Sequence, residues 1–483
     1  MRKYLLLVFT LLSLMTCIAQ DAHYWTEQYG TRSMLLSNSI SGSVEDLGAV
    51  YYNPARLSLI EDNAFLISGK VYQLSTYSFD SKSDEGRTSP SSQSSFGGAP
   101  SLLAGTYRIK GLDKHAFAYS FLGRRSMDIN ISEGSSVYGD VLPTIPGEEY
   151  FSGDILLQKK FNEEWMGLSW SYAPNKQFSI GVSNFLSIRK QQAKSAYKAQ
   201  AYTNAEDVET YNNMNSYSYS HIGLLWKLGL AWQNDPVSLG VTVTTPMLSI
   251  SGNGSFNYER VYTGINDLNP IYERDNQSDI DMTYKTPFSI AAGIGVRLKR
   301  GSLHGSAEYF HGVNEYTMMT AAPFVGQSTG DDYQAFLIDQ LNSVLNFGVG
   351  YNFVFSDAVN GYISYSSDFS AAVANIGDND SFKSHTYAST FNSNINHFGG
   401  GVVMRLKRAD ITVGASLATT KYTMDTPLGL PSEGGGGIYD ENNQTDVRWN
   451  RWRFIVGISI PFLTDFAKKW EDKLLDGGAK KAE

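Results

Sequence analysis

Cysteine is almost absent from this 483-residue sequence: the single one, Cys17, lies within the first twenty residues. Those residues read as an export signal, with a basic start and then an apolar run that is too short to span a bilayer comfortably. Cys17 and Ala19 occupy the small-residue positions of a cleavage site, which predicts a signal peptide over residues 1–19. The alternative is a lipoprotein signal with Cys17 lipidated, although Thr16 fits that motif poorly. Either signal predicts export.

Without its signal the mature chain has no cysteine, which excludes a disulfide framework, a thiol nucleophile and a thiolate metal site. Basic residues are also in deficit, with 39 Lys and Arg against 48 Asp and Glu and a formal charge of −9. Loss of the two basic residues of the signal moves that charge to about −11. Because nucleic-acid binding requires a basic surface, this balance predicts that the protein binds no nucleic acid.

Long apolar runs are missing too, since no segment after the signal approaches 18 consecutive apolar residues. The sequence therefore predicts no transmembrane helix. Aromatic residues and glycine are abundant instead, with 30 Tyr, 25 Phe and 45 Gly, at a mean hydropathy of −0.26. This composition is typical of β proteins, and leaves open two soluble β domains or one large barrel.

Large apolar residues alternate with small or polar ones in many segments, which is the period of a β-strand with two different faces. The clearest series is Trp452, Phe454, Val456, Ile458, Ile460 and Phe462. This pattern predicts fourteen strands, over residues 63–79, 100–110, 115–131, 163–174, 177–200, 216–233, 237–262, 279–298, 303–319, 345–356, 359–371, 395–406, 411–425 and 448–462.

The connections between these strands alternate between six short turns and seven polar loops of roughly 15 to 31 residues. Short turns at one end and long loops at the other are typical of bacterial outer-membrane barrels, and closure is required because lipid cannot satisfy a sheet edge. A soluble β-sandwich or propeller would not sort its loops in this way. The expected fold is therefore all-β: a 14-stranded antiparallel transmembrane barrel over residues 63–462, in the outer membrane of a Gram-negative cell, with both termini periplasmic.

A barrel of fourteen strands leaves a lumen, and the inward residues expected here are largely Gly, Ser, Asn and Ala. Residues 20–62 are the material available to fill it. Near their end stands "GAVYYNPARLSLI", in which Asn53 and Pro54 are a good helix cap and first helical residue.

An export signal, a segment ending in "VYYNPARLSL" and fourteen strands together resemble the FadL/TodX family of outer-membrane transporters for hydrophobic compounds. In that family the N-terminal segment folds into the lumen as a hatch, with an Asn-Pro-Ala motif close to the first strand. The resemblance implies a hatch over residues 20–62, with hatch and gating residues Gly48, Tyr51, Tyr52, Asn53, Pro54 and Ala55. Two departures are the Tyr51–Tyr52 pair, where the family commonly has Trp or Phe, and residues 463–483, which we expect to form a periplasmic amphipathic tail or a solvated one.

The third expected strand contains "FLGRRSM", in which Gly123 and Arg125 share the outward phase of the apolar residues around them. Arg125 either lies at the outer membrane interface, where an outward charge costs little, or a bulge or kink at Gly123 turns it inward. An inward kink in the third strand that opens a lateral exit is what the resemblance implies for these two residues.

Other motifs predict no chemistry. The acidic loop clusters 276–281, 329–333 and 377–381 lack the spacing of an EF-hand and favour solvated loops over Ca²⁺ sites or divalent-cation bridges to lipopolysaccharide. His304, Ser306 and Glu308 alternate on the inward face of one strand, where a polar wall is favoured over a catalytic triad. We therefore expect no enzyme, no catalytic residue, no cofactor and no metal.

The expected function is passive uptake of a hydrophobic small molecule, such as a long-chain fatty acid, through a monomeric channel that the hatch gates. Its expected partners are that ligand, outer-membrane lipids and lipopolysaccharide, and the barrel assembly machinery. Two alternatives remain open: a shuttle for type IX secretion, as some FadL-like barrels of Bacteroidetes-type bacteria are, and a general diffusion porin.

Overall fold

The computed structural model describes residues 23–60, 65–82, 88–109, 111–140, 147–263, 270–371, 373, 383–387, 393–407, 409–425 and 444–460. The expected signal peptide, the expected tail and the acidic cluster 377–381 lie outside these residues. Within the described part of the chain, no helix has the length and apolar character needed to cross a membrane.

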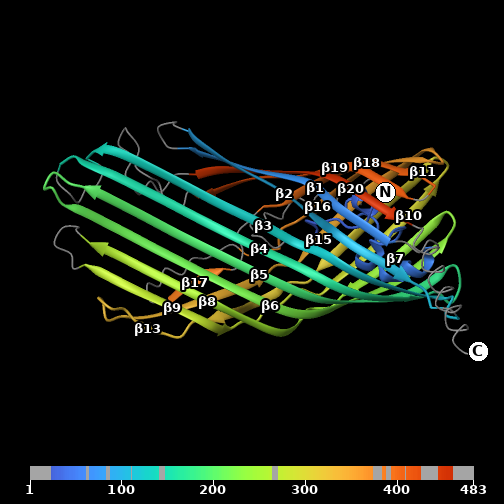
Figure 1. Ribbon diagram of the computed structural model, residues 1–483, viewed down its shortest axis with the longest axis horizontal. Helices are drawn as coiled ribbons and strands as arrows, with labels where there is room; N and C mark the ends of the chain where they lie inside the picture. Colours follow the sequence, from blue (N-terminus) through green and yellow to red (C-terminus); the bar gives the residue numbers. More distant parts are fainter. Residues whose placement is uncertain are drawn as a thin grey trace, which may run out of the picture.

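The protein is a closed antiparallel barrel of fourteen strands (Figure 1). Strands that follow one another in this wall are paired, and the ring closes where β1 pairs with β20 from Phe65–Ile460 to Lys82–Gln444. The fourteen strands are β1 (Phe65–Lys82), β2 (Thr88–Tyr107), β3 (His115–Gly139), β4 (Glu149–Tyr172), β5 (Phe178–Tyr202), β6 (Val208–Asn234), β7 (Val237–Thr244), β10 (Ser289–Leu298), β11 (Gly301–Phe310), β15 (Val344–Ser356), β16 (Val359–Asp368), β18 (Ile395–Arg405), β19 (Asp410–Asp425) and β20 (Gln444–Ile460).

In three places the structure has two shorter strands where the sequence predicts a single one. The single strands predicted over 237–262, 279–298 and 303–319 are therefore wrong. Pro246 and Pro287 lie in two of the breaks, where their missing N–H groups cannot join a ladder. Beyond the breaks β8 and β9 continue the sheet from β6, and β12, β14, β13 and β17 form a smaller sheet. These outer strands are β8 (Leu248–Thr263), β9 (Ile271–Asp281), β12 (Val313–Thr320), β13 (Phe324–Val325), β14 (Asp332–Leu341) and β17 (Lys383–Tyr387).

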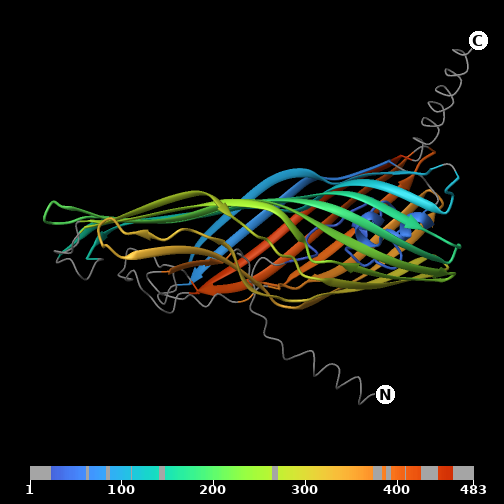
Figure 2. The same cartoon turned by 90° about the horizontal axis from the view of Figure 1, so that it is seen from below.

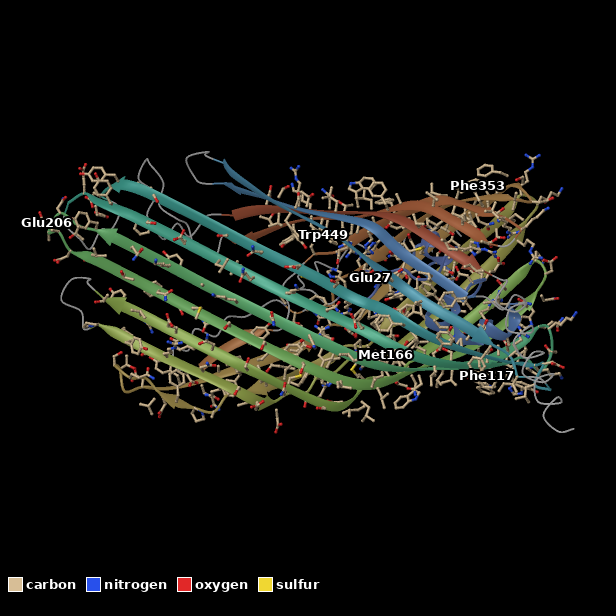
Figure 3. The ribbon with its side chains drawn as sticks, viewed as in Figure 1. Glu27, Phe117, Met166, Glu206, Phe353 and Trp449 are labelled. Atoms are coloured by element: carbon tan, nitrogen blue, oxygen red, sulfur yellow. The ribbon has the colours of Figure 1, made fainter. Side chains whose placement is uncertain are left out.

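Much of the expected long loops is strand. The hairpins β3–β4 and β5–β6 extend far beyond the rest of the wall, and Glu206 marks the tip of the second (Figure 3). Residues 132–162 and 201–215, expected as loops, are therefore mostly paired. In this projecting part polar residues stand on both faces of the sheet among the apolar ones, so the regular alternation that reveals a strand is weaker. We call this end of the barrel the projecting end and the opposite one the short-turn end.

An apolar band surrounds the half of the barrel next to the short-turn end. In β20 the expected outward residues Phe454 and Ile458 are 53% and 42% exposed, whereas Arg453 and Ile455, on either side of Phe454, are buried. The predicted assignment of the two faces of this strand is confirmed. Phe117, Met166 and Phe353 lie in the same half (Figure 3), and such a band is the surface that lipid covers in an outer-membrane barrel.

We expect Phe454→Arg to destabilise the barrel by about 2–4 kcal/mol, because it places a charge in the lipid-facing band. Heat-modifiability on gels, which separates folded from unfolded barrels, measures the effect. Phe454→Leu is the matched control, since it keeps an apolar side chain at the same exposed position. Equal mobility shifts for the two variants would contradict the assignment of this face to lipid.

Residues 23–60, here called the luminal segment, lie inside the barrel at the short-turn end (blue in Figures 1 and 2). The segment contains η1 (Ser33–Leu36), α2 (Ala49–Tyr52) and η2 (Pro54–Leu59). Its side chains are buried almost throughout, and Glu45 is exposed. Its short helices contact β4, β5 and β6 on one side and β16 and β18 on the other.

Candidate functional site

Asn53, Pro54 and Ala55 join α2 to η2 at the wall of the lumen. Oδ1 of Asn53 accepts a hydrogen bond from the Ala55 N–H at 3.1 Å, and Pro54 opens the 3₁₀ helix, so the predicted helix cap is confirmed. Nδ2 of the same side chain donates to the backbone oxygens of Ser41 at 3.0 Å and of Leu230 in β6 at 2.9 Å. One buried amide thus caps a helix, fastens two limbs of the luminal segment together and attaches both to the barrel.

Glycines in the wall make room for this contact. A Cβ added to Gly181 of β5 would lie 2.5 Å from the Ala55 nitrogen, and one added to Gly229 of β6 would lie 2.3 Å from Asn53 Oδ1. A Cβ on Gly240 of β7 would come within 2.4 Å of the Ser41 oxygen. The inward glycines are therefore the places where the backbone of the luminal segment lies directly against the wall.

Gly48 is the N-cap residue of the short helix α2, and a neighbouring carboxylate organises the turn before that helix. Asp46 is 7% exposed and accepts hydrogen bonds from the backbone N–H groups of Arg32 at 2.7 Å, Ser33 at 2.9 Å and Gly48 at 2.9 Å. A Cβ on Gly48 would lie 2.8 Å from Asp46 Oδ1. Asp46 holds η1 against α2, a role that its place in the sequence did not reveal.

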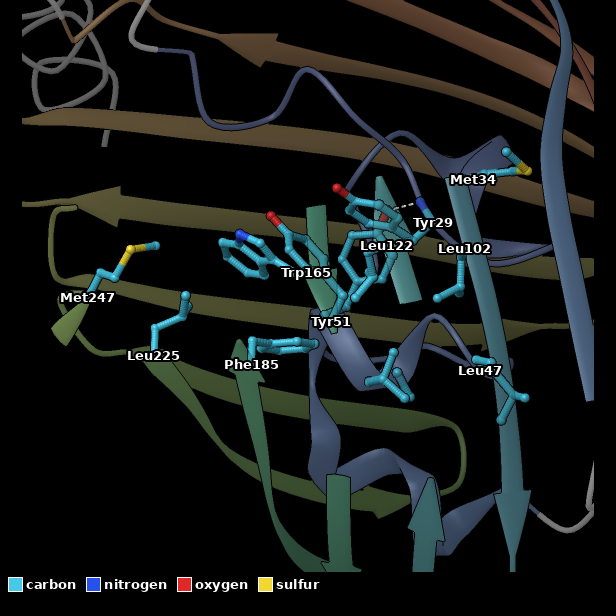
Figure 4. Packing of buried hydrophobic residues seen from close by; sticks show 14 of the residues in the cluster. Tyr29, Met34, Leu47, Tyr51, Leu102, Leu122, Trp165, Phe185, Leu225 and Met247 are labelled. Atoms are coloured by element: carbon cyan, nitrogen blue, oxygen red, sulfur yellow. Dashed lines mark hydrogen bonds between the residues drawn. The ribbon is translucent and has the colours of Figure 1, made fainter. Parts of the chain in front are cut away.

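Tyr51 and Tyr52 of α2 face a cluster of aromatic rings (Figure 4). The ring of Tyr51 lies 4.5 Å from that of Tyr29 and 6.1 Å from that of Trp165 in β4, between centroids. The hydroxyl of Tyr52 accepts a hydrogen bond from the Tyr29 N–H at 3.0 Å. Phe185 extends the cluster, with its ring 5.2 Å from Trp165.

Two wall cations contact the same ring. The Arg124 guanidinium of β3 lies 5.5 Å from the Tyr51 centroid and 5.3 Å from that of Trp165, and Lys227 Nζ of β6 lies 4.6 Å from Tyr51. Burial raises the pKa of Tyr51 to about 12, so its ring stays neutral. Attraction between a cation and a ring face is stronger in a desolvated site, so this arrangement stabilises the buried segment.

His304, Ser306 and Glu308 of β11 each hold a different part of the luminal segment. His304 Nδ1 lies 2.6 Å from Ser43 Oγ, Ser306 Oγ accepts from the Ser41 N–H at 2.9 Å, and Glu308 accepts from the Trp25 indole N–H at 2.8 Å. The polar wall expected for these three residues is what the structure shows.

The first residues of the segment bind to buried charges of the wall, which sequence reasoning missed. Glu27 is paired with Arg453, and Arg451 Nη1 lies 3.8 Å from the same carboxylate. Asp368 Oδ1 accepts from the backbone N–H groups of Tyr24 and Trp25 at 3.0 Å each. The sequence signal that could have revealed such pairs is the position of Arg451 and Arg453 on the inward face of an otherwise apolar strand. A charge that is buried requires a partner of opposite charge.

The ladder between β3 and β4 shifts register between Gly123 and Arg125, which leaves Arg124 as the extra residue of a β-bulge. Arg124 is 4% exposed, and the Arg125 guanidinium lies 5.3 Å from the centroid of Tyr24, so both arginines point inward. Ile129 is buried as well. The single outward phase expected over 115–131 is therefore wrong beyond Gly123, because a bulge exchanges the two faces of a strand.

The pairing between β2 and β3 ends next to this bulge, and we call the stretch in which these two strands are not paired with each other the wall opening. β2 pairs with β3 from Leu102–Leu122 to Tyr107–Phe117, and no pair beyond Leu122 joins the described residues of the two strands. β3 nevertheless continues along β4 to Gly139. Pro100 of β2 stands where the pairing stops and has no N–H to donate.

The luminal segment contacts the edge of this opening. The Tyr29 hydroxyl donates to the backbone oxygens of Gly123 at 3.3 Å and Arg124 at 3.4 Å, and Arg124 Nη2 donates to the Tyr24 oxygen at 2.8 Å. Among the predicted residues, Tyr51 and Tyr52 reach this region through their contacts with Tyr29 and Arg124, and Gly123 and Arg125 form its rim. Asn53, Pro54 and Ala55 lie elsewhere, against β5, β6 and β7. Among the described residues, no three or more His, Cys, Asp or Glu side chains are placed to hold a metal ion.

No protein-family model matches the sequence, and no curated protein sequence is similar to it. Solved structures are similar in fold. A FadL homologue from Pseudomonas aeruginosa is 12% identical with a TM-score of 0.54, covering 92% of this chain and 100% of its own. The toluene transporter TodX from Pseudomonas putida is 12% identical with a TM-score of 0.53, covering 90% of this chain and 98% of its own. The chain therefore has the fold of the FadL/TodX family.

Proposed function

We propose that this protein is a passive outer-membrane channel for hydrophobic small molecules, with the luminal segment as its hatch. In this proposal the short-turn end faces the periplasm and the projecting end faces outward, as in other outer-membrane barrels. The similar fold of a toluene transporter and of a FadL homologue supports the substrate class. A passive channel requires no catalytic group.

The observation that carries the proposal is the contact between the luminal segment and the rim of the wall opening. Tyr29 and Tyr24 bind the bulge of β3 directly, so a movement of the segment changes the contacts at the opening. A ligand from the projecting end would pass the aromatic cluster and leave at the opening or past the displaced segment.

The lining of this region suits an apolar ligand with an acidic head group. Leu225 and Met247 extend the aromatic cluster beyond Phe185 with apolar side chains (Figure 4). Beside the cluster, Nε and Nη1 of the buried Arg124 have no hydrogen-bond partner among the described residues. Such N–H groups bind a carboxylate well, so a long-chain fatty acid fits better than a neutral hydrocarbon.

The test is lipid analysis of the purified barrel by native mass spectrometry, together with uptake of a labelled fatty acid and of toluene by cells. Bound fatty acid and protein-dependent uptake are expected. A barrel that copurifies with a secreted protein and takes up neither compound would support the secretion shuttle instead.

We expect deletion of Arg124 to lower uptake at least about tenfold, because it removes the bulge and lets β3 pair with β2 across the opening. The deletion keeps every other side chain of β3 on its present face, since the bulge is the point at which the faces exchange. Arg124→Gln keeps the bulge and removes the charge, which makes it the matched control. Unchanged uptake in the deletion variant, with folding shown by heat-modifiability, would contradict a lateral exit.

A further inference from the structure

Three lysines lie together on the outward face of the sheet, directly above the apolar band. The outward residues of β5 from Phe178 to Ile188 are mostly apolar, and this length matches the ~9–11 residues that cross a hydrocarbon core. The next outward cations are Lys190 and Lys194 of β5, and Lys160 of β4 lies beside them. In the orientation proposed above, these side chains reach the level of the outer-leaflet headgroups.

The register of β4 and β5 brings the three ammonium groups together. Lys160 pairs with Gln192, which lies between Lys190 and Lys194 on the same face. Side chains directly opposite on one face are about 4.5–5.5 Å apart at Cβ, and diagonal neighbours about 7–8 Å. Three flexible lysines at these spacings can direct their charges to one phosphate group. We call Lys160, Lys190 and Lys194 the lysine triad.

Hydroxyl and amide groups continue the surface from the lysine triad across β6 and β8. Ser218 of β6 pairs with Gln192, and its Oγ lies 2.8 Å from Ser255 Oγ of β8. Two adjoining hollows, of about 560 and 490 Å³, follow this surface. Both are lined by Lys160, Gln192, Ser218 and Ser255. A cationic end and a neutral hydrogen-bonding floor match the chemistry of a phosphorylated sugar.

The other face of the same strands is fixed by a buried network, so the outward lysines are held in register. Arg189 Nη1 lies 3.0 Å from Glu163 Oε2, and Arg189 Nε donates to the Tyr219 hydroxyl at 3.0 Å. Gln191 donates to the Tyr217 hydroxyl at 2.9 Å. These inward side chains are buried, which places the hollows on the outward face.

Acidic groups near the lysine triad leave it available to an anion. Lys160 Nζ lies 3.8 Å from Asp128 Oδ2, and both side chains are more than 60% exposed, so this pair is weak and exchanges readily with another anion. Glu164 accepts a hydrogen bond from Asn162 at 2.9 Å on the side of the apolar band. Asp279 lies at the far end of the larger hollow. Lys190 and Lys194 form no ion pair with a described residue.

We propose that the lysine triad binds the phosphate of an anionic outer-leaflet lipid, the phosphorylated disaccharide headgroup of lipopolysaccharide, with the hydroxyl and amide surface of the hollows against its sugar. Lysine acts here as a point charge that needs no fixed geometry. This inference rests on the proposed orientation in the membrane, and it is independent of which molecule the lumen carries.

The test is native mass spectrometry of the full barrel in detergent, titrated with lipid A bearing two phosphates and with the same lipid A after dephosphorylation. We expect the phosphorylated form to bind at least about tenfold more tightly. The triple variant Lys160→Gln, Lys190→Gln, Lys194→Gln should lose this preference, since each basic side chain near an anionic lipid surface is worth about fivefold in affinity.

Lys198→Gln is the matched control, because Lys198 lies on the same strand and the same face. Lys198 and its neighbour across the ladder, Asp154, both lie outside the hollows. An equal loss in this control, or an unchanged preference in a triple variant that stays heat-modifiable, would overturn the proposal. Displacement of the lipid by millimolar inorganic phosphate would also overturn it, because it would show a simple anion site. Uptake of hydrophobic compounds is measured separately, so a failure here leaves the proposed transport function standing.

Discussion

A barrel without residues 23–55 should fold and conduct ions at least about tenfold better than the full chain, because these residues occupy a lumen that fourteen strands otherwise leave open. The wall does not need the segment to close, since β1 and β20 pair along their whole length. The wall groups that bind the segment, such as Arg453 and Glu308, would become hydrated instead of remaining buried without a partner. Conductance in planar bilayers measures the change.

The matched control for this deletion is Asn53→Ala in the full chain. It removes the amide that joins the Ser41 and Leu230 backbones but leaves the segment in the lumen. An intermediate conductance with frequent openings is expected, because one buried hydrogen-bonding group is lost. Equal conductance of the deletion variant and the full chain would mean that the luminal segment does not close the pore.

The membrane half of the barrel could be predicted from sequence because its two faces meet different surroundings. Phe454 and Ile458 contact the outside while Arg453 and Ile455 face the lumen, so their alternation records the fold. This contrast is weaker in the projecting half, and residues 132–162 therefore resembled a loop, although 132–139 and 149–162 form two paired strands. Pro246 and Pro287 stand in the sequence at two of the strand breaks. The alternating pattern on both sides of each proline nevertheless predicted one continuous strand.

The candidate site was predictable where a residue acts locally and was missed where it acts across the fold. Asn53 caps the helix that follows it, which the sequence shows directly. Glu27 and Asp368 act through partners more than three hundred residues away, in pairs that only the closed barrel brings together. The bulge at Arg124 is an intermediate case. The Gly-Arg-Arg sequence indicated where a bulge could occur, and the register shift in the structure showed that both arginines point inward.

A disulfide between residues 31 and 457 should reduce uptake at least about tenfold under oxidising conditions, and a reductant should restore it. An added Cβ on Gly457 of β20 lies 3.4 Å from the Thr31 Cβ of the luminal segment, close to the 3.5–4.5 Å that disulfides require. The double variant Thr31→Cys, Gly457→Cys would therefore fix the segment to the wall. The sequence contains no cysteine after Cys17, which lies in the expected signal peptide, so no native cysteine within the barrel competes for this pairing.

The wall itself supplies the control for this variant. Thr412 of β19 pairs with Gly457, and its Cβ is also 3.4 Å from the added Cβ, so Thr412→Cys, Gly457→Cys links two wall strands and leaves the segment free. This control should transport equally well oxidised and reduced. If the 31–457 disulfide also leaves uptake unchanged while deletion of Arg124 lowers it, the ligand leaves through the opening between β2 and β3 without displacing the segment. If the disulfide blocks uptake and the Arg124 deletion does not, the ligand passes the segment toward the short-turn end, because only that route requires the Thr31 limb to move away from β20.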